Sequence, residues 1–281
     1  MRLRPATMSA FAAAFSAPAK KAALVSFITA GFPRADSTPR MMESLAAAGA
    51  DVLEIGMPFS DPSADGPAIQ RANETALQNG MTLAKTLEAV AAFRAAGNDT
   101  PVALMGYANS ALNWRGGVAG FGAAAQAAGV NGLIIVDPAD DERAQWRDAL
   151  NASGIEMINL IAPTTSAARL GRLAAESQGF VYAVSLKGVT GAKHMDAEAA
   201  GELINAARRA AKTPVAAGFG VRTPAQARAL GELADGVVVG SRIVEAAETA
   251  AQNGEDGIAA AAAVVAELAA ALKSSPAEGA A

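Results

Sequence analysis

The stretch DVLEIGMPFSDPSADGPAIQRAN, residues 51–73, begins with the pattern of a buried strand and ends with that of a helix. The apolar run comes first, a connection of residues 57–67 follows, and a helix-compatible segment covers 67–79. A strand followed by a helix predicts one β-α unit, and the rest of the chain decides how many such units there are. One residue, Glu54, interrupts the apolar pattern of the strand where Val or Ile is expected.

Similar apolar runs recur along the whole chain and alternate with Ala-rich, helix-compatible stretches. Near-continuous hydrophobic runs are typical of parallel strands that are covered on both faces. The predicted strands are residues 23–31, 50–58, 101–107, 131–137, 156–163, 179–185, 214–220 and 235–241. The predicted helices between them are residues 39–48, 82–96, 118–128, 140–152, 166–177, 196–211, 224–234 and 257–273. This alternation predicts an α/β protein with a (β/α)8 TIM barrel, and a doubly wound open sheet is the alternative.

We expect a single barrel domain, residues 1–273, because no linker rich in Pro, Gly or Ser divides the chain. The end of the chain, residues 274–281, is predicted to be a disordered tail. The first 23 residues loosely resemble a secretory signal, but their Ala-rich centre favours a short helix that covers one end of the barrel. Long loops are expected after strand two, at 57–67, and after strand six, at 186–195, on the catalytic face.

The composition disfavours several classes of function. The chain has 23 Lys and Arg against 27 Asp and Glu, a net charge of −4, and no basic block. Nucleic-acid binding needs a clustered positive surface, so it is disfavoured. The absence of Cys excludes thiol nucleophiles, disulfides and cysteine-ligated metals. No run approaches the roughly 18 apolar residues of a membrane span, and we expect a cytoplasmic protein.

Acidic residues around strand two are the first candidates for catalysis. Glu54 in the layer between sheet and helices would carry a large desolvation penalty, so we expect it to face the barrel mouth. Burial there would raise its pKa and suit it to proton transfer, although neighbouring hydroxyls could also simply satisfy it. Asp65 could be catalytic or could cap the helix of 67–79, and Asp61 could be a turn residue. Nothing completes a metal set, so no metal is expected, and the sole histidine, His194, is interpreted as a loop residue.

Glycine-rich turns after the last strands suggest an anion site. The segment AGFGVRTP (217–224) follows strand seven, and VVGSRI (238–243) follows strand eight. Their small residues let the backbone approach a ligand, and Ser241 begins a helix whose N-terminus attracts anions. A third glycine loop, KGVTGAKH (187–194), is expected to close over the same region. We therefore expect a phosphate site at Gly218, Gly220, Gly240 and Ser241, and we count Phe219, Thr190 and Gly191 among the substrate-binding residues.

Several of these segments together resemble one family. LEIGMPFSDPSADGPAIQ (53–70) and VYAVSLKGVTGA (181–192) closely resemble signatures of the tryptophan synthase α subunit family. SFITAGFP (26–33), MGYAN (105–109), AGFGV (217–221) and VGSRIV (239–244) fit the same family in order and spacing. The resemblance implies a lyase that cleaves indole-3-glycerol phosphate to indole and glyceraldehyde 3-phosphate in L-tryptophan synthesis. It also implies that Glu54 and Asp65 are the catalytic acids.

The same resemblance implies further site residues and a partner. Tyr182 matches an active-site tyrosine of the family, and Phe27, Tyr107 and Ile161 would offer apolar or aromatic surface to a flat ring. The chain itself is expected to need no cofactor, while the partner is a pyridoxal-phosphate-dependent β subunit in an α2β2 assembly. Expected contacts with it are Pro58, Asp61 and Asn109.

Some residues depart from the family pattern. They are Ser63, Lys187 and the segment VDPADDE (136–142), and they bear on loop packing and partner contacts. Two other readings stay open: a stand-alone indole-3-glycerol-phosphate lyase, and a non-catalytic barrel that only activates a partner. The nearest rival, however, is another phosphate-handling barrel enzyme, such as an indole-glycerol-phosphate synthase or a relative of the sugar-phosphate isomerases.

Overall fold

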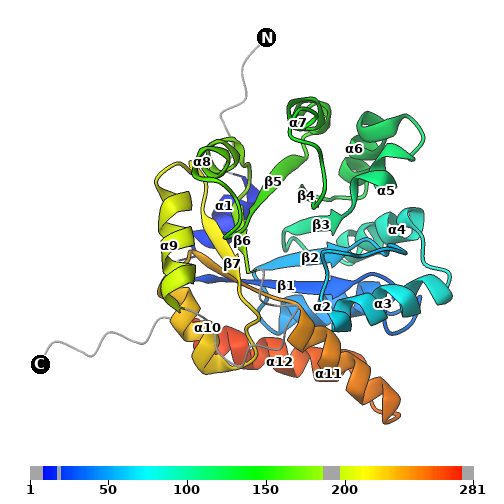
Figure 1. Cartoon of the computed structure of the whole chain (residues 1–281). Helices are drawn as coiled ribbons and strands as arrows, with labels where there is room; N and C mark the ends of the chain where they lie inside the picture. The colour runs from blue at the N-terminus through cyan, green and yellow to red at the C-terminus, as the bar shows by residue number, and fades with distance from the viewer. Residues whose placement is uncertain (1–8, 18–19, 186–196, 274–281) are drawn as a thin grey trace, which may run out of the picture.

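The computed structural model describes residues 9–17, 20–185 and 197–273, and shows a closed barrel of eight parallel strands surrounded by helices (Figure 1). Each strand pairs with the next along the chain, and β8 closes the barrel on β1, with Val25 opposite Val238. The strands are β1 (Ala23–Thr29), β2 (Val52–Gly56), β3 (Val102–Gly106), β4 (Gly132–Ile135), β5 (Glu156–Ile161), β6 (Val181–Val184), β7 (Val215–Gly218) and β8 (Gly236–Val239). The predicted TIM barrel is confirmed, and each strand lies inside its predicted range.

The helices follow the predicted alternation with some additions. They are α1 (Ala10–Phe15), α2 (Thr38–Ala47), α3 (Pro67–Gln78), α4 (Leu83–Ala95), α5 (Ala108–Leu112), α6 (Gly117–Ala127), α7 (Arg143–Asn151), α8 (Ala167–Glu176), α9 (Ala197–Arg208), α10 (Pro224–Gly231), α11 (Ser241–Gln252) and α12 (Gly257–Ala271). The short α5 was not predicted, and α11 was indicated only by its first residue. The β2–β3 connection holds two helices, α3 and α4, and α11 and α12 both follow β8.

The barrel interior is filled by one side chain from each strand except β6, by Phe180 directly before β6 and by one side chain from α1. These residues form a buried apolar cluster of Phe11, Val25, Val52, Ala103, Ile134, Ile158, Phe180, Ala216 and Val238. A separate, larger cluster joins the outer face of the strands to the helices. Because both faces of the strands are covered, their sequences lack the alternation of a half-exposed sheet.

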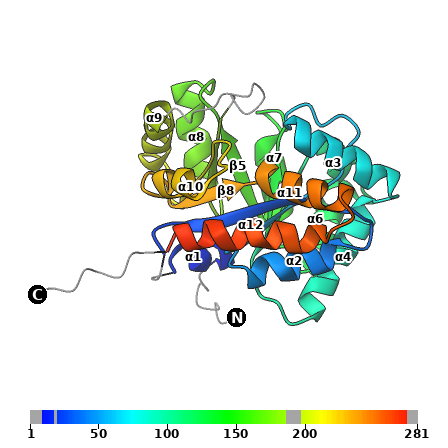
Figure 2. The same ribbon diagram turned by 90° about the horizontal axis from the view of Figure 1, so that it is seen from below.

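The helix α1 closes the end of the barrel at which the strands begin (Figure 2). Phe11 is fully buried and packs edge-on against Phe180, with ring centroids 5.6 Å apart. Just before the helix, the Ser9 hydroxyl donates a hydrogen bond of 2.7 Å to Glu156. The expected covering helix is therefore present, and it leaves the opposite end of the barrel for ligands. Residues 1–8 and 274–281 lie outside the described part of the chain, as does the segment 186–196 after β6.

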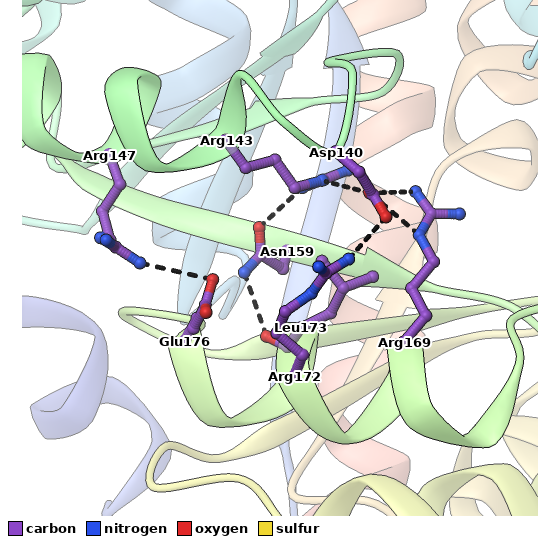
Figure 3. Close-up of polar contacts among 8 residues, drawn as sticks. All are labelled: Asp140, Arg143, Arg147, Asn159, Arg169, Arg172, Leu173 and Glu176. Atoms are coloured by element: carbon purple, nitrogen blue, oxygen red, sulfur yellow. Dashed lines mark hydrogen bonds and ion pairs between the residues drawn. The ribbon is translucent and has the colours of Figure 1, made fainter.

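A polar network links the β4–α7 and β5–α8 units on the outside of the barrel (Figure 3). Arg143 at the start of α7 donates to the Asn159 side-chain oxygen on β5 at 2.9 Å, and the Asn159 amide donates to the carbonyl of Leu173 on α8 at 3.0 Å. Arg143, Arg169 and Arg172 also surround the single carboxylate of Asp140. The buried part of this network fixes how two neighbouring units pack.

Candidate active site

Glu54 lies inside the barrel, next to Phe27 on β1 and Ala103 on β3 in the strand register. Since Val52 belongs to the interior cluster, Glu54 two residues later points to the same side of β2. Its side chain is fully buried, and neither carboxylate oxygen has a hydrogen-bond partner among the described residues. Burial raises the pKa of Glu54 to about 8, and the charge of Asp65 adds to this rise. Glu54 is therefore protonated at neutral pH and free to give up its proton. The alternative that neighbouring hydroxyls satisfy the Glu54 carboxyl is wrong for the described residues, since none of them donates to it.

Asp65 lies in the connection between β2 and α3, near the barrel mouth. Its carboxylate accepts a hydrogen bond from the Tyr107 hydroxyl at 3.2 Å. Burial raises the pKa of Asp65 to about 6, and the bond from Tyr107 opposes part of that rise. The residue that caps α3 is Gly66, and no side chain makes a capping bond there, so the helix-cap interpretation of Asp65 is wrong.

Tyr107 connects Asp65 to the rest of its loop. Besides donating to Asp65, its hydroxyl accepts a hydrogen bond from the backbone N–H of Ala64 at 3.0 Å. Its ring stacks on Phe59, with centroids 4.8 Å apart and planes 18° apart. Burial raises the pKa of Tyr107 above its usual value, so the phenol stays protonated and can donate to Asp65.

Tyr182 enters the same interior from β6. An added Cβ on Gly218 would lie 2.8 Å from the Tyr182 hydroxyl, so the glycine on β7 makes room for the phenol. The pKa of Tyr182 is raised well above its usual value, first by burial and then by the charges of Glu54 and Asp65. The phenol therefore remains a hydrogen-bond donor directed at the region of the two acids.

Phe27 is positioned by two other glycines. A Cβ on Gly56 would lie 2.7 Å from the Phe27 ring, and one on Gly240 would lie 3.1 Å from it. The ring thus occupies the space that these glycines leave free. A small cavity opens beside it, lined by Phe27, Gly56, Met57, Asp65, Asn73, Met105, Gly106, Tyr107 and Val136.

The structure corrects one expected apolar contact and adds others. Ile161 lies on the opposite face of β5 from the interior residue Ile158, because successive strand residues alternate in direction. Leu160 packs against the interior cluster in its place. Met105 was also missed, although it precedes Tyr107 by two residues and could have been assigned to the same face. Asn73 carried no sequence signal, since only the fold brings α3 beside this loop.

The glycine turns lie where the sequence predicted them, at the ends of two adjacent strands. Gly220 is exposed and has a positive φ of 67°, a conformation that favours glycine. Gly240 is the residue before α11, and Ser241 is the first residue of that helix. Phe219 is half-buried between the two glycines of its turn. The other expected members, Thr190 and Gly191, lie outside the described residues, as do Lys187 and His194.

The residues expected to meet a partner lie on neighbouring connections. Pro58 and Asp61 belong to the loop after β2, and Asn109 lies in α5 directly after β3. Asp61 and Asn109 are exposed, and Pro58 is partly exposed. They therefore share one side of the open end of the barrel.

The described residues also bear on metal binding and on membrane insertion. In those ranges no group of His, Cys, Asp and Glu side chains is arranged to hold a metal ion. Nor does the described part of the chain contain a helix of the length and apolar character that crossing a bilayer requires.

Comparison with known proteins agrees with this geometry. The family model described as tryptophan synthase alpha chain matches residues 13–273. The tryptophan synthase alpha chain of Laribacter hongkongensis is 49% identical over 244 residues, which cover 87% of this chain and 91% of that protein. That of Caulobacter sp. strain K31 is 50% identical over 236 residues, covering 84% and 85%.

Solved structures give the same result. Tryptophan synthase subunit alpha from Legionella pneumophila superposes with a TM-score of 0.86 at 33% identity, covering 95% of this chain and 99% of its own. A chain of Mycobacterium tuberculosis tryptophan synthase has a TM-score of 0.86 at 37% identity, covering 96% and 100%. The match of the family model to nearly the whole chain and the high identity of full-length relatives lead to one conclusion: the chain belongs to the tryptophan synthase alpha chain family.

Proposed function

We propose that this chain cleaves indole-3-glycerol phosphate to indole and glyceraldehyde 3-phosphate, with Glu54 as the proton-transfer group and Asp65 as the charge-stabilising group. The observation that carries the assignment is the buried Glu54 carboxyl, which has no hydrogen-bond partner in the described part of the chain and which senses the charge of Asp65. A carboxyl in that state is costly for the fold, and its use in catalysis explains why it is there.

In the proposed reaction, protonated Glu54 donates its proton to C3 of the indole ring. The protonated ring then accepts the electron pair of the bond to the glycerol phosphate chain as that bond breaks. The 3′-hydroxyl loses its proton to the Glu54 carboxylate, and its oxygen becomes the aldehyde oxygen of glyceraldehyde 3-phosphate. Glu54 gives one proton to the ring and takes one from the hydroxyl, so it serves as acid and then as base.

Positive charge develops at the ring N1–H during the first step. An ionised Asp65 that accepts a hydrogen bond from this N–H stabilises the charge. Tyr182 supplies a phenol that can orient the substrate hydroxyl or the Glu54 carboxyl, while Phe27, Met105 and Leu160 offer apolar surface to the ring.

The phosphate of the substrate is assigned to the turns after β7 and β8. Gly218, Phe219, Gly220, Gly240 and Ser241 supply backbone N–H groups and the N-terminus of α11, an arrangement that attracts anions. Thr190 and Gly191 are proposed to complete the site.

The partner is a tryptophan synthase β subunit, and we propose an α2β2 assembly in which that subunit carries pyridoxal phosphate. Pro58, Asp61 and Asn109 are its proposed contacts. Indole is small and apolar, so direct transfer to the partner prevents its loss by diffusion. We assign the assembly to the cytoplasm and treat residues 1–273 as one domain followed by a short tail.

The experiment is an assay of indole release by the full chain, with and without a β-type subunit. Glu54→Gln should lower the rate of indole release by roughly 100-fold or more, because the proton-transfer group is lost. At neutral pH the free energy of unfolding of this variant should equal or exceed that of wild type, because a neutral amide replaces a carboxyl that is costly to ionise. A Glu54→Gln variant that keeps more than about a tenth of the wild-type rate contradicts the assignment. High activity of the isolated chain with no gain from a β-type subunit would favour a stand-alone lyase.

A further inference from the structure

We propose that Asn73 is a positioning residue of this site: its side chain holds the loop of residues 57–66 in the arrangement that places Asp65 at the barrel mouth. The proposal rests on the proposed function, because it assigns a task to Asp65. It concerns a residue that carries no charge and takes no direct part in the reaction.

Asn73 is well placed to hold this loop. It lies on α3 and is 4% exposed, and its side chain reaches the first part of the loop. The side-chain oxygen accepts a hydrogen bond from the backbone N–H of Phe59 at 3.0 Å. The side-chain nitrogen donates to the carbonyl of Ile69, one turn back on α3, at 2.9 Å. Since both ends of the amide are bonded, its orientation is fixed, and the position of Phe59 is fixed with it.

Asn73 is connected to Asp65 through the stacked rings of Phe59 and Tyr107. Phe59, held by its backbone N–H, stacks on Tyr107 with ring centroids 4.8 Å apart. The Tyr107 hydroxyl then binds the far part of the same loop, accepting from Ala64 at 3.0 Å and donating to Asp65 at 3.2 Å. Asn73 and Tyr107 therefore hold the loop near its two ends, and Phe59 connects them.

The other contacts of the loop hold its first residue, are exposed to water or lie within the loop. The Met57 N–H donates to the carbonyl of Met105 on β3 at 2.8 Å, which attaches the chain two residues before Phe59. The side chain of Gln70 donates to the Asp65 carbonyl at 2.9 Å, but this bond is exposed to water. Within the loop, the Asp65 N–H donates to the Pro62 carbonyl at 3.0 Å, which shapes the turn without attaching it to the barrel. Loss of the Asn73 amide would leave the Phe59 N–H without its partner and let the loop move beyond Met57. A displacement of about 1 Å in a catalytic group can cost on the order of 100-fold in rate.

The chain offers a matched control on the same helix. Asn79, at the C-terminal end of α3, donates from its side chain to the carbonyls of Gly31 and Pro33, each at 3.0 Å. Like Asn73, it ties α3 to a loop through its amide. Its loop carries none of the residues assigned to the reaction.

The test compares Asn73→Leu with Asn79→Leu in the full chain, alone and with a β-type subunit. Leucine keeps the branched shape of the asparagine side chain, is somewhat bulkier and removes its hydrogen bonds. The corresponding alanine variants replace the pair if leucine impairs folding. We expect Asn73→Leu to lower kcat by tenfold or more while KM changes by less than about threefold, because the phosphate site is untouched. Asn79→Leu should leave kcat within about threefold of wild type, and because Asn79 is exposed its loss of stability should be no larger than that of Asn73→Leu.

A second comparison asks whether Asn73 acts through Asp65. In the Asp65→Asn background, adding Asn73→Leu should change kcat by less than about threefold, since the group that Asn73 positions is already lost. Equal losses of kcat in Asn73→Leu and Asn79→Leu would overturn the proposal. A full tenfold loss that persists in the Asp65→Asn background would overturn it as well.

Amide hydrogen exchange gives a readout that does not depend on activity. Exchange of the segment 57–66 should accelerate in Asn73→Leu and stay unchanged in Asn79→Leu. Unchanged exchange in Asn73→Leu would show that Asn73 does not hold the loop. Failure of the proposed function has a different signature: wild-type protein that releases no indole, or Glu54→Gln that remains active.

Discussion

Burial of the Glu54 carboxyl both destabilises the fold and gives the residue the protonation state that the proposed reaction requires. It is fully buried without a hydrogen-bond partner among the described residues, so its charged form is disfavoured and its proton is retained to about pH 8. Asp65 is buried less and is bonded to Tyr107, so it loses its proton near pH 6. The two carboxyl groups therefore hold different protonation states over the interval between these values.

This difference predicts how the rate depends on pH. Below about pH 6 Asp65 becomes protonated and no longer accepts from the ring N–H, while above about pH 8 Glu54 has lost the proton that it must donate. The profile of kcat/KM should therefore be bell-shaped, with limbs near these two values. In Asp65→Asn the acidic limb should disappear, and the alkaline limb should move to lower pH because a charge that raised the pKa of Glu54 is removed. An alkaline limb that stays in place would show that the two carboxyl groups do not interact.

At the scale of single elements, the helix α11 contributes its N-terminus to the proposed phosphate site. Its first residue is Ser241, directly after β8 and Gly240. The first N–H groups of a helix lack partners within the helix and carry partial positive charge, so a negative side chain there competes with a bound phosphate.

We predict that Ser241→Asp raises KM for the phosphorylated substrate by tenfold or more through charge repulsion, with kcat less affected. The fold should tolerate the change, because an acidic residue in the first turn stabilises a helix. Ala167→Asp is the matched control, since it adds the same charge to the first position of α8, outside the proposed phosphate site. Steady-state kinetics of both variants check the prediction. A similar rise in KM for Ala167→Asp would point to a general charge effect.

Buried hydrogen bonds of Asn159 determine how two neighbouring β-α units pack. Asn159 on β5 is 4% exposed, and it bonds to Arg143 on α7 and to the Leu173 carbonyl on α8 (Figure 3). We predict that Asn159→Leu lowers the free energy of unfolding by about 2 kcal/mol or more, because the buried guanidinium loses an acceptor. Urea denaturation measures this change. Arg169→Met should cost less than about 1 kcal/mol, since its pair with Asp140 is exposed. If both variants lost the same free energy of unfolding, burial would not determine how much each contact of this network stabilises the fold.

At the scale of the whole molecule, the two ends of the barrel differ in what they can do. The helix α1 closes one end with Phe11, while the acids, the cavity and the glycine turns meet at the other. Any partner that receives a product from this site must approach the open end. Asp61 is exposed there, in the same loop as Asp65.

We predict that Asp61→Ala loses most of the activation by a β-type subunit and retains the basal indole release of the isolated chain. The reason is that Asp61 lies outside the cavity but on the loop that carries Asp65, so a partner bound to it can order that loop. Asp99→Ala is the control, because Asp99 is an exposed acid on the connection from α4 to β3, at the closed end. The measurement is the rate of indole release against the concentration of the β-type subunit. Full activation of Asp61→Ala would exclude this role, and a loss of basal activity would make Asp61 part of the catalytic site.

The barrel, the strand ranges and the side of β2 to which Glu54 points were all predictable from the amino-acid sequence. Eight apolar runs alternating with helices admit few arrangements, and a carboxyl in a buried strand has only one tolerable side to face. The pattern also indicated the glycine turns as an anion site, and the family resemblance selected the catalytic reading of Asp65 over the helix cap. These features depend on local pattern, which a single chain displays directly.

Which side chains meet around the acids was not predictable in this way and became visible in the folded structure. It placed Leu160 and not Ile161 in the interior, because the direction of each strand residue depends on a register that a uniformly apolar run conceals. It showed that Asp65 bonds to Tyr107 and does not cap α3, and it brought Asn73 to the backbone of Phe59. It also produced the separation of the two pKa values, since burial and charge proximity arise from residues that are distant in the chain. Such contacts depend on how whole elements pack, and no local pattern in the sequence encodes them.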